Sequence, residues 1–214
     1  MIEHKTVSLA DQVFEQLEND ILSGKYHRGE NLSESKLTLE LGVSRTPIRE
    51  ALRRLEQEHL IEESPKGLEV VGINDKDLED IFMIRSKLEG QAAAMAALNH
   101  TEEQLAYLRE AVEFQEFYLD KNDPERIKKM DSRFHETVYR MCGSAVFYDV
   151  LLPLHKKILK YRRASVSNTS RAEASVAEHR AIYNAIESND SIMAEKLIIE
   201  HLNNAYQSMQ KKGN

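Results

Sequence analysis

The sequence is poor in the features that mark several protein classes. Its 214 residues include one cysteine, four prolines, eight glycines and no tryptophan. The single cysteine, Cys142, excludes an intramolecular disulfide and is typical of a reducing compartment. No apolar run approaches the roughly 20 residues that a membrane helix needs, and the acidic, amphipathic N-terminus does not resemble a secretion signal. These absences predict a cytoplasmic protein with no membrane partner.

Charge is abundant, but its sign disfavours unspecific attraction to nucleic acids. Charged residues make up 30% of the chain, and the net charge is −7. Residues 1–72 also contain more acidic than basic side chains. A DNA-binding function would therefore depend on where positive charge is placed rather than on its total amount. One short stretch concentrates four arginines: Arg45, Arg49, Arg53 and Arg54.

That stretch, residues 32–55, predicts two short helices joined by a tight turn. Leu37 and Leu41 lie four residues apart on one face of a first helix over residues 34–41. Gly42 supplies the turn, because glycine enters the left-handed backbone conformation without steric cost. A second helix begins after Ser44, a favourable N-cap residue. Its buried stripe consists of Ile48, Leu52 and Leu55.

The exposed start of the second helix carries Arg45, Thr46 and Arg49. In a helix-turn-helix this part of the second helix enters the major groove, where arginine makes two parallel hydrogen bonds to guanine. The same spacing also fits a helical hairpin whose arginines are merely solvated. The flanking chain favours the interpretation as a DNA-reading element.

A further helix and a hairpin are predicted around this stretch. Residues 8–24 read as a helix capped by Ser8. Residues 60–61 and 68–71 are short β-prone runs, separated by the turn signal at residues 64–67. Three helices followed by a small hairpin form a winged helix, whose tip, at Lys66 and Gly67, can touch a minor groove or phosphates. The alternative is an ordinary surface turn.

The rest of the chain predicts only helices. Six helices of this length predict an antiparallel bundle, in which ligand sites are built from facing helices. The predicted fold class is therefore mostly α, with an N-terminal winged helix-turn-helix followed by an antiparallel all-helical bundle of about six helices. The expected spans are 76–97, 102–121, 123–142, 145–162, 170–188 and 190–210.

An arginine interrupts the apolar stripe of the first bundle helix. The stripe contains Arg85, and a buried guanidinium needs a partner. Glu89, four residues later, can supply that partner. Alternatively, Arg85 awaits the carboxylate of a ligand, which its planar fork binds with two hydrogen bonds. The residues alone leave both interpretations open.

A carboxylate and three histidines also face the predicted interior. Asp131 and His135 share one face of the helix over residues 123–142, and His179 and His201 fall on the apolar stripes of two later helices. Such a set suits zinc, nickel, cobalt, iron or manganese better than calcium or magnesium. The alternative is that each histidine is a hydrogen-bonded core residue. We interpret the remaining histidines, including His155, as surface or packing residues.

A longer motif strengthens the DNA-reading interpretation. It comprises Leu32, Glu34, Leu37, Leu41, the run GVSRTPIREAL at residues 42–52, and Leu55. Through it, residues 10–72 resemble the winged-helix domain of the GntR family of bacterial transcription regulators. The resemblance implies that Arg45, Thr46 and Arg49 contact DNA, and we add Ser44, Lys66 and Gly67 to the expected DNA-binding set. Two positions depart from the family pattern, Arg28 in place of proline and Thr38 in place of alanine.

The helical part carries a second motif. It comprises Asp131-x-x-Phe134-His135, Glu178-His179-x-x-Ile182 and His201-Leu202, together with Arg85 and Glu89. Through it, residues 75–210 resemble the FCD effector-binding domain of the FadR subfamily, in its shorter, VanR-like branch. The resemblance implies a divalent transition metal, such as zinc, nickel or manganese, held by Asp131, His135, His179 and His201. It also implies a small carboxylate effector beside the metal, contacted by Arg85.

These observations together predict a ligand-responsive, metal-containing, DNA-binding transcription regulator that acts as a homodimeric repressor. The expected domains are a DNA-binding domain at residues 1–73 and an effector-binding and dimerisation domain at residues 74–214. The expected partners are a pseudo-palindromic double-stranded DNA operator and a small organic acid. There are two other interpretations. One is a regulator whose metal is purely structural and whose effector binds elsewhere, and the other is a metal-dependent enzyme. The enzyme is disfavoured because no general base or nucleophile stands out near the four ligands.

Overall fold

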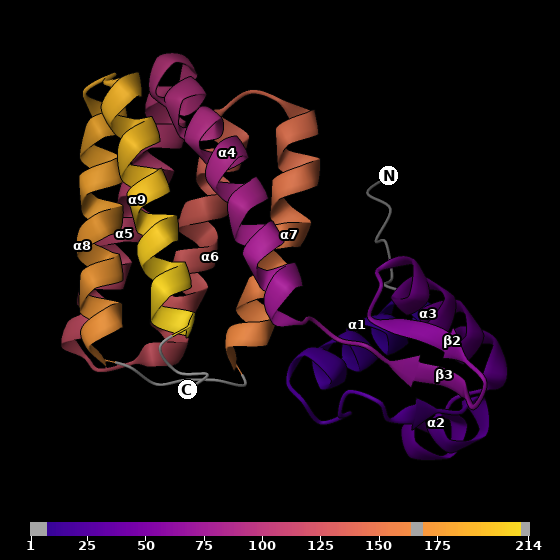
Figure 1. The fold of residues 1–214 in the computed structure, drawn as a ribbon. Coiled ribbons are helices and arrows are strands. Elements are labelled where there is room, and N and C mark those ends of the chain that lie inside the picture. Colours follow the sequence, from indigo (N-terminus) through magenta and orange to yellow (C-terminus); the bar gives the residue numbers. More distant parts are fainter. Residues whose placement is uncertain (1–7, 164–168, 211–214) are drawn as a thin grey trace, which may run out of the picture. The chain divides into compact units, whose positions relative to one another are not determined.

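The computed structural model describes residues 8–163 and 169–210, and the chain divides into two compact units, which are considered separately. The first unit comprises residues up to Asp75. Its elements are α1 (Leu9–Leu22), β1 (Asn31–Leu32), α2 (Glu34–Leu41), α3 (Arg45–Gln57), β2 (Ile61–Ser64) and β3 (Gly67–Val70) (Figure 1). This order is that of a winged helix, as the sequence predicts.

The wing is a small antiparallel sheet with the strand order β1-β3-β2. β2 and β3 form the expected hairpin, in which Ser64 pairs with Gly67 across the turn. The sequence did not predict β1, whose two residues add to the other edge of β3, with Asn31 opposite Glu69. A two-residue strand has no periodicity of its own, so only the pairing with β3 reveals it.

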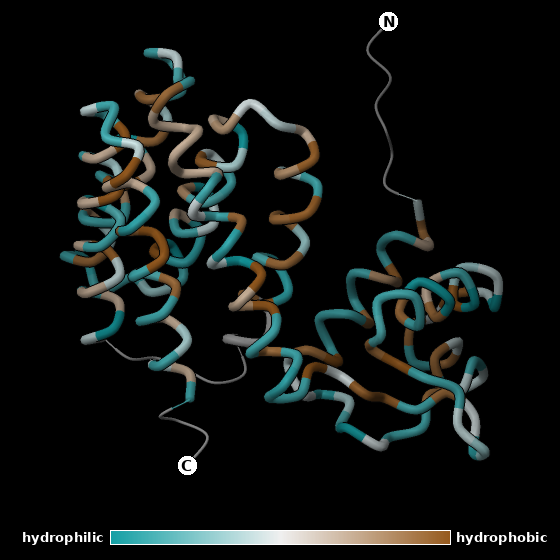
Figure 2. Tube along the Cα trace, turned by 45° about the horizontal axis from the view of Figure 1, so that its top comes forward, coloured by the Kyte–Doolittle hydropathy of each residue, from teal (hydrophilic) through white to brown (hydrophobic). Residues whose placement is uncertain are grey.

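The N-terminal unit has its own hydrophobic core. α1 begins at its N-cap Ser8, whose side chain accepts a hydrogen bond from the backbone N–H of Asp11. The predicted left-handed turn is found at Gly42, with φ +67°. Hydrophobic positions lie on the inner side of the trace (Figure 2). The core includes most of the apolar stripes of the three helices, whereas Leu41 of the predicted stripe of α2 is only partly buried against it. The buried members are Val13, Leu17, Ile21, Leu37, Ile48, Leu52 and Leu55.

The second unit is a bundle of helices that stand side by side (Figure 1). Short turns join them, apart from residues 164–168, which lie outside the described residues. All bounds agree with the predicted spans to within two residues, and no helix among the described residues combines the length and apolar character needed to cross a bilayer. The helices are α4 (Asp75–Asn99), α5 (Glu102–Asp120), α6 (Pro124–Met141), α7 (Ala145–Arg163), α8 (Thr169–Glu187) and α9 (Ser191–Gln210).

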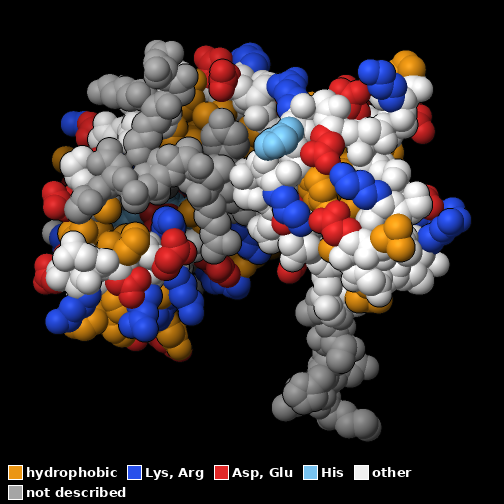
Figure 3. Space-filling model, turned by 90° about the horizontal axis from the view of Figure 1, so that it is seen from below, with side chains coloured by type: hydrophobic (Ala, Val, Ile, Leu, Met, Phe, Trp, Pro, Cys, Tyr) orange, Lys and Arg blue, Asp and Glu red, His pale blue; other side chains and the backbone are white. Residues whose placement is uncertain are grey.

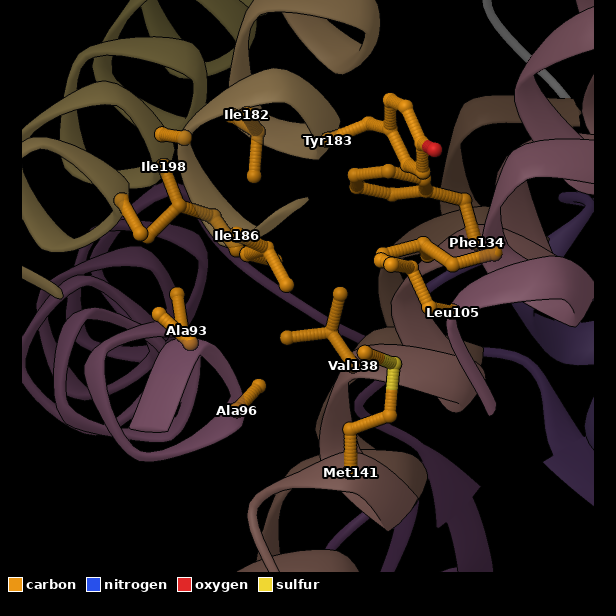
Figure 4. Packing of buried hydrophobic residues seen from close by; sticks show 14 of the residues in the cluster. Ala93, Ala96, Leu105, Phe134, Val138, Met141, Ile182, Tyr183, Ile186 and Ile198 are labelled. Carbon is orange, nitrogen blue, oxygen red and sulfur yellow. The ribbon is translucent and has the colours of Figure 1, made fainter. Parts of the chain in front are cut away.

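The core of the bundle draws side chains from α4, α5, α6, α8 and α9. Figure 4 shows Phe134, Val138, Ile182 and Ile186 converging on a common interior. Gly90 allows α4 and α9 to approach closely, because a Cβ atom there would lie 2.9 Å from Ile199 Cδ1. This dry packing surrounds the polar residues that the sequence analysis placed on buried stripes.

The buried face of α4 differs slightly from the predicted one. The predicted stripe included Ile81 and Leu88, but both are only partly buried, whereas Phe82 and Glu89 are buried. At both positions the buried residue is the one that follows the predicted residue in the chain. The reason is that α4 packs against helices on more than one side. Arg85 stays on the buried face in either description.

Candidate metal centre and nucleic-acid interface

The start of α3 presents the predicted DNA-reading residues to solvent. Ser44, Arg45, Thr46 and Arg49 are all exposed, whereas Ile48 on the opposite face is fully buried. Ser44 occupies the N-cap position in an extended conformation, but its side chain makes no capping hydrogen bond. The first N–H groups of α3 therefore donate no hydrogen bond to that hydroxyl. Such N–H groups are well suited to phosphate oxygens.

The wing tip is exposed and internally fixed. The Ser64 hydroxyl donates to the Gly67 carbonyl, and the backbone N–H of Lys66 donates to the Ser64 hydroxyl oxygen. Asn31 Nδ2 donates to the Lys66 carbonyl at 2.5 Å. Gly67 has φ +110°, and a Cβ atom there would lie 3.0 Å from Asn31 Nδ2. Glycine is therefore needed at this turn both for its backbone conformation and for the close approach of Asn31.

Positive charge on the N-terminal unit is interleaved with negative charge. Figure 3 shows Lys and Arg side chains beside Asp and Glu on the face in view. Arg49 Nε lies 2.7 Å from Glu34 Oε1, and Arg54 Nη1 lies 2.5 Å from Asp11 Oδ1. Two of the four clustered arginines are thus paired within the unit. The surface is not a uniformly basic one.

Three predicted metal ligands come together inside the bundle. His135 of α6, His179 of α8 and His201 of α9 are buried, and one potential ligand atom from each lies within 4.8 Å of the others. The His179 and His201 Nε2 atoms are 3.3 Å apart. The carboxylate of Asp131, also buried, lies 3.9 Å from His179 Nε2. The four residues predicted from the sequence therefore share one interior site, in which the histidines form the tightest group.

Each histidine of this group also faces a polar partner with its Nδ1 atom. The acceptors are Glu89 at 3.0 Å from His135, Gln115 at 2.6 Å from His179 and Glu178 at 2.7 Å from His201. A carboxylate accepts only, so Nδ1 of His135 and His201 carries the proton when the ring is neutral. The amide oxygen of Gln115 imposes the same tautomer on His179. The Nε2 lone pairs then face the site, which is the arrangement found around protein-bound metals.

Burial keeps the imidazoles of His179 and His201 neutral. Desolvation lowers the pKa of His179 well below its ordinary value. Desolvation also lowers the pKa of His201, although the hydrogen bond to Glu178 opposes that shift. A metal ligand must be deprotonated, so neutral imidazoles are ready to bind a cation at neutral pH.

The two carboxylate partners, Glu89 and Glu178, are themselves held in the charged form. Burial disfavours ionisation of Glu89, but the charge of Arg85 overcomes it and lowers the pKa of the Glu89 carboxyl. Burial likewise opposes ionisation of Glu178, but hydrogen bonds from His201 and Arg171 lower its pKa to about 2. Arg171 donates two hydrogen bonds of 2.8 Å to the carboxylate of Glu178. Negative charge therefore surrounds the three imidazoles.

Arg85 is paired inside the bundle. Its Nε atom donates to Glu89 Oε1 at 2.5 Å, and both side chains are almost completely buried. Its Nη2 atom lies 3.1 Å from Nδ1 of His155. Of the two interpretations that the sequence left open, the Arg85–Glu89 pair is present. The guanidinium reaches the histidine group indirectly, because Glu89 also accepts from His135.

Two families of known proteins match the two parts of this chain. The FCD domain family matches residues 80–204, more than half of the chain, and the gntR family of bacterial regulatory proteins matches residues 9–67. The chain belongs to the gntR family and carries an FCD domain. This membership makes it a DNA-binding transcription regulator.

Relatives of this gntR-family regulator match it over nearly its whole length. The HTH-type regulator YdhC of Bacillus subtilis is 28% identical over 90% of this chain and 87% of that protein. The HTH-type transcriptional repressor RspR of Escherichia coli is 25% identical over 96% of this chain and 91% of that protein. The solved structure of E. coli McbR/YncC has a TM-score of 0.78 at 25% identity, covering 98% of this chain and all of that one.

The gntR-family regulator also contains polar residues around the site that sequence reasoning missed. The interpretation of His155 as a surface or packing residue without a group was incomplete. It is buried, its ring centroid lies 4.6 Å from that of His135, and it contacts Arg85. Gln115 was also missed. It lies one helical turn after the buried Ala111 and Val112, and a glutamine on this apolar face of α5 was a visible signal. Glu178 belonged to the second sequence motif but was given no role there, and it is the hydrogen-bond partner of His201.

Proposed function

We propose that this gntR-family regulator is a repressor whose helical domain binds a divalent transition metal and, beside it, a small carboxylate effector. One observation carries the proposal. The Nδ1 atoms of three buried imidazoles all face acceptors, so that their Nε2 atoms are left for a cation. The charged Glu89 and Glu178 favour that cation further. Zinc, nickel and manganese fit this set of ligands.

The proposed ligands are Asp131, His135, His179 and His201. The metal would act as a Lewis acid that attracts a carboxylate of the effector. Glu89, Gln115 and Glu178 orient the imidazoles. Arg85 balances the charge of Glu89, and Arg171 balances that of Glu178. Arg85 is proposed as an effector contact whose guanidinium is shared between Glu89 and the incoming carboxylate.

On the DNA side, residues 1–73 are proposed to form the DNA-binding domain and residues 74–214 the effector and dimerisation domain. Arg45 and Arg49 would read bases or bind phosphates, and Ser44, Thr46, Lys66 and Gly67 would mainly position the protein. A homodimer would place two α3 helices in successive major grooves of a pseudo-palindromic operator. The relative RspR, named as a repressor, supports the direction of regulation.

Operator binding provides the test. A duplex selected by the protein from genomic DNA is titrated with the metal-loaded protein, the chelated protein and the loaded protein with a panel of small carboxylates. The proposal expects one acid to release DNA from the loaded protein and to have less effect after chelation. By linkage, that acid must bind the DNA-bound protein more weakly than the free protein. Release by no acid would favour a purely structural metal, and turnover of a substrate without DNA affinity would refute the proposal.

A further inference from the structure

A carboxylate lies against an arginine that is proposed to enter the major groove. Glu34 is the first residue of α2 and Arg49 lies near the start of α3, so their contact joins the two helices of the helix-turn-helix. Oε1 of Glu34 accepts a hydrogen bond from Nε of Arg49 at 2.7 Å. The hydrogen bond from Arg49 lowers the pKa of Glu34, and the charge of Arg45 lowers it further. Glu34 therefore interacts with two of the arginines assigned to DNA.

The fold itself does not require this pair. The two side chains are 61% and 34% exposed, and exposed ion pairs contribute little to folding. α2 is held by other contacts, because Ser33 caps it and Leu37 is buried in the core. The Thr38 hydroxyl also donates to the Glu34 carbonyl, which any residue at position 34 would offer. Loss of the Glu34 carboxylate should leave the helix-turn-helix intact.

The hydrogen bond occupies only one edge of the guanidinium. It uses Nε, and within the described part of the chain the two Nη groups of Arg49 have no protein partner. Those Nη groups form the end of the guanidinium that can bind O6 and N7 of guanine together. The pair therefore restrains the side chain of Arg49 and still leaves its base-reading end available.

We infer that Glu34 is a positioning residue that raises the specificity of Arg49 for its base. Restraint of a long side chain before binding reduces the ordering cost of binding a guanine. At a non-specific site the arginine gains no base contact, so its restraint gives no advantage there. The restraint therefore raises the ratio of operator affinity to non-specific affinity. The inference rests on the proposed DNA contact of Arg49.

The test compares four full-length variants: Glu34→Ala, Glu34→Gln, Arg49→Ala and the control Glu56→Ala. Glu56 is an exposed glutamate nearly two turns after Arg49, so its loss removes the same charge from α3 without touching the pair. Affinity is measured for a selected operator and for a scrambled duplex. Base preference is measured by selection from operators with randomised positions, and melting curves confirm that each variant folds.

The inference predicts that Glu34→Ala lowers the affinity ratio about tenfold and relaxes the same base pair that Arg49→Ala relaxes. Glu34→Gln should give a smaller loss, because its amide oxygen still accepts from Nε, and Glu56→Ala should keep the ratio. The inference is overturned if Glu34→Ala keeps full preference at the base pair that Arg49→Ala relaxes. It is also overturned if a different base pair relaxes, since Glu34 would then read a base itself. Unchanged operator affinity in Arg49→Ala would show that Arg49 makes no important DNA contact. The proposed role of Arg49 and the inference about Glu34 would then both fail.

Discussion

His179 Nε2 and His201 Nε2 lie 3.3 Å apart in the interior of the helical unit. Both rings direct Nδ1 to an acceptor, Gln115 in one case and Glu178 in the other. Two unprotonated nitrogens at this distance repel each other unless a proton or a cation lies between them. Desolvation disfavours the proton by lowering the pKa of both imidazoles. The metal ion that we propose would lie between these two nitrogens.

The Arg85–Glu89 pair gives the first prediction. Arg85→Met leaves a buried carboxylate without its countercharge, and Glu89→Gln leaves a buried guanidinium. Each single variant should lower the free energy of unfolding by about 3–5 kcal/mol. The double variant should lose less than the sum, by at least about 1 kcal/mol. Urea unfolding of the metal-free protein, followed by the helical signal, measures all three.

Additive losses in that cycle would show that Arg85 and Glu89 act independently, contrary to their 2.5 Å contact. The same variants address the effector. If Arg85 also binds the carboxylate, Arg85→Met should weaken release of the operator by the active acid even where the protein remains folded. If its role is only to balance Glu89, folded Arg85→Met should respond to the acid as the natural protein does.

Acid should weaken the contribution of Glu178. Its pKa in the folded protein is depressed from its ordinary 4.5 to about 2. A depressed carboxyl pKa means that the stabilisation is fully present above pH 4.5 and is lost as the pH falls from 4.5 towards 2. Because Glu178 is only half buried, solvent screening limits its effect to about 1–2 kcal/mol.

The natural protein and Glu178→Gln should therefore differ in free energy of unfolding at pH 6, and the difference should shrink at pH 3.5. Glu173→Gln, an exposed site on the same helix, provides the matched control and should show no comparable difference. A gap for Glu178→Gln that is equally large at both pH values would contradict the assigned ion pair with Arg171 and the hydrogen bond with His201.

Arg49→Ala should separate DNA binding from assembly. Loss of a two-bond contact to a base should lower operator affinity about a hundredfold, with the oligomeric state unchanged. Fluorescence anisotropy measures the first quantity and light scattering the second. Arg126→Ala is the control, because Arg126 is an exposed arginine of α6 that pairs with Asp123 and lies over the ring of Tyr118 in the same helical unit. Loss of assembly in Arg49→Ala would refute its assignment as a DNA-reading residue.

Local sequence signals predicted the elements of this fold well. Helical periodicity placed Val176, His179, Tyr183 and Ile186 on one buried face of α8, and all four are buried. Gly42 marked the turn before α3 because its conformation is required locally. These features depend on residues only a few positions apart, so their physical cause is visible in the sequence.

The polar surroundings of the site were harder to predict, because they depend on contacts between distant helices. Gln115 and His179 are separated by 64 positions, and Arg85 and His155 by 70. Neither helix alone shows which polar residue on a neighbouring helix will face it. The sequence also left the partner of Arg85 undecided, and the packing of α4 against α6 and α7 accommodates the Arg85–Glu89 pair in the interior. Sequence patterns thus indicated which histidines lie together in the interior, whereas packing determined their hydrogen bonds.

Elemental analysis of the purified protein tests the central claim most directly. The natural protein, His179→Ala and the control His100→Ala are compared after identical purification and incubation with zinc, nickel or manganese. His100 lies outside the histidine group, and its Nδ1 atom lies 3.0 Å from the carbonyl oxygen of Ala96. The account predicts roughly one tightly held ion per chain in the natural protein and in His100→Ala, and a large loss in His179→Ala. The same metal content in His179→Ala as in the natural protein would contradict it.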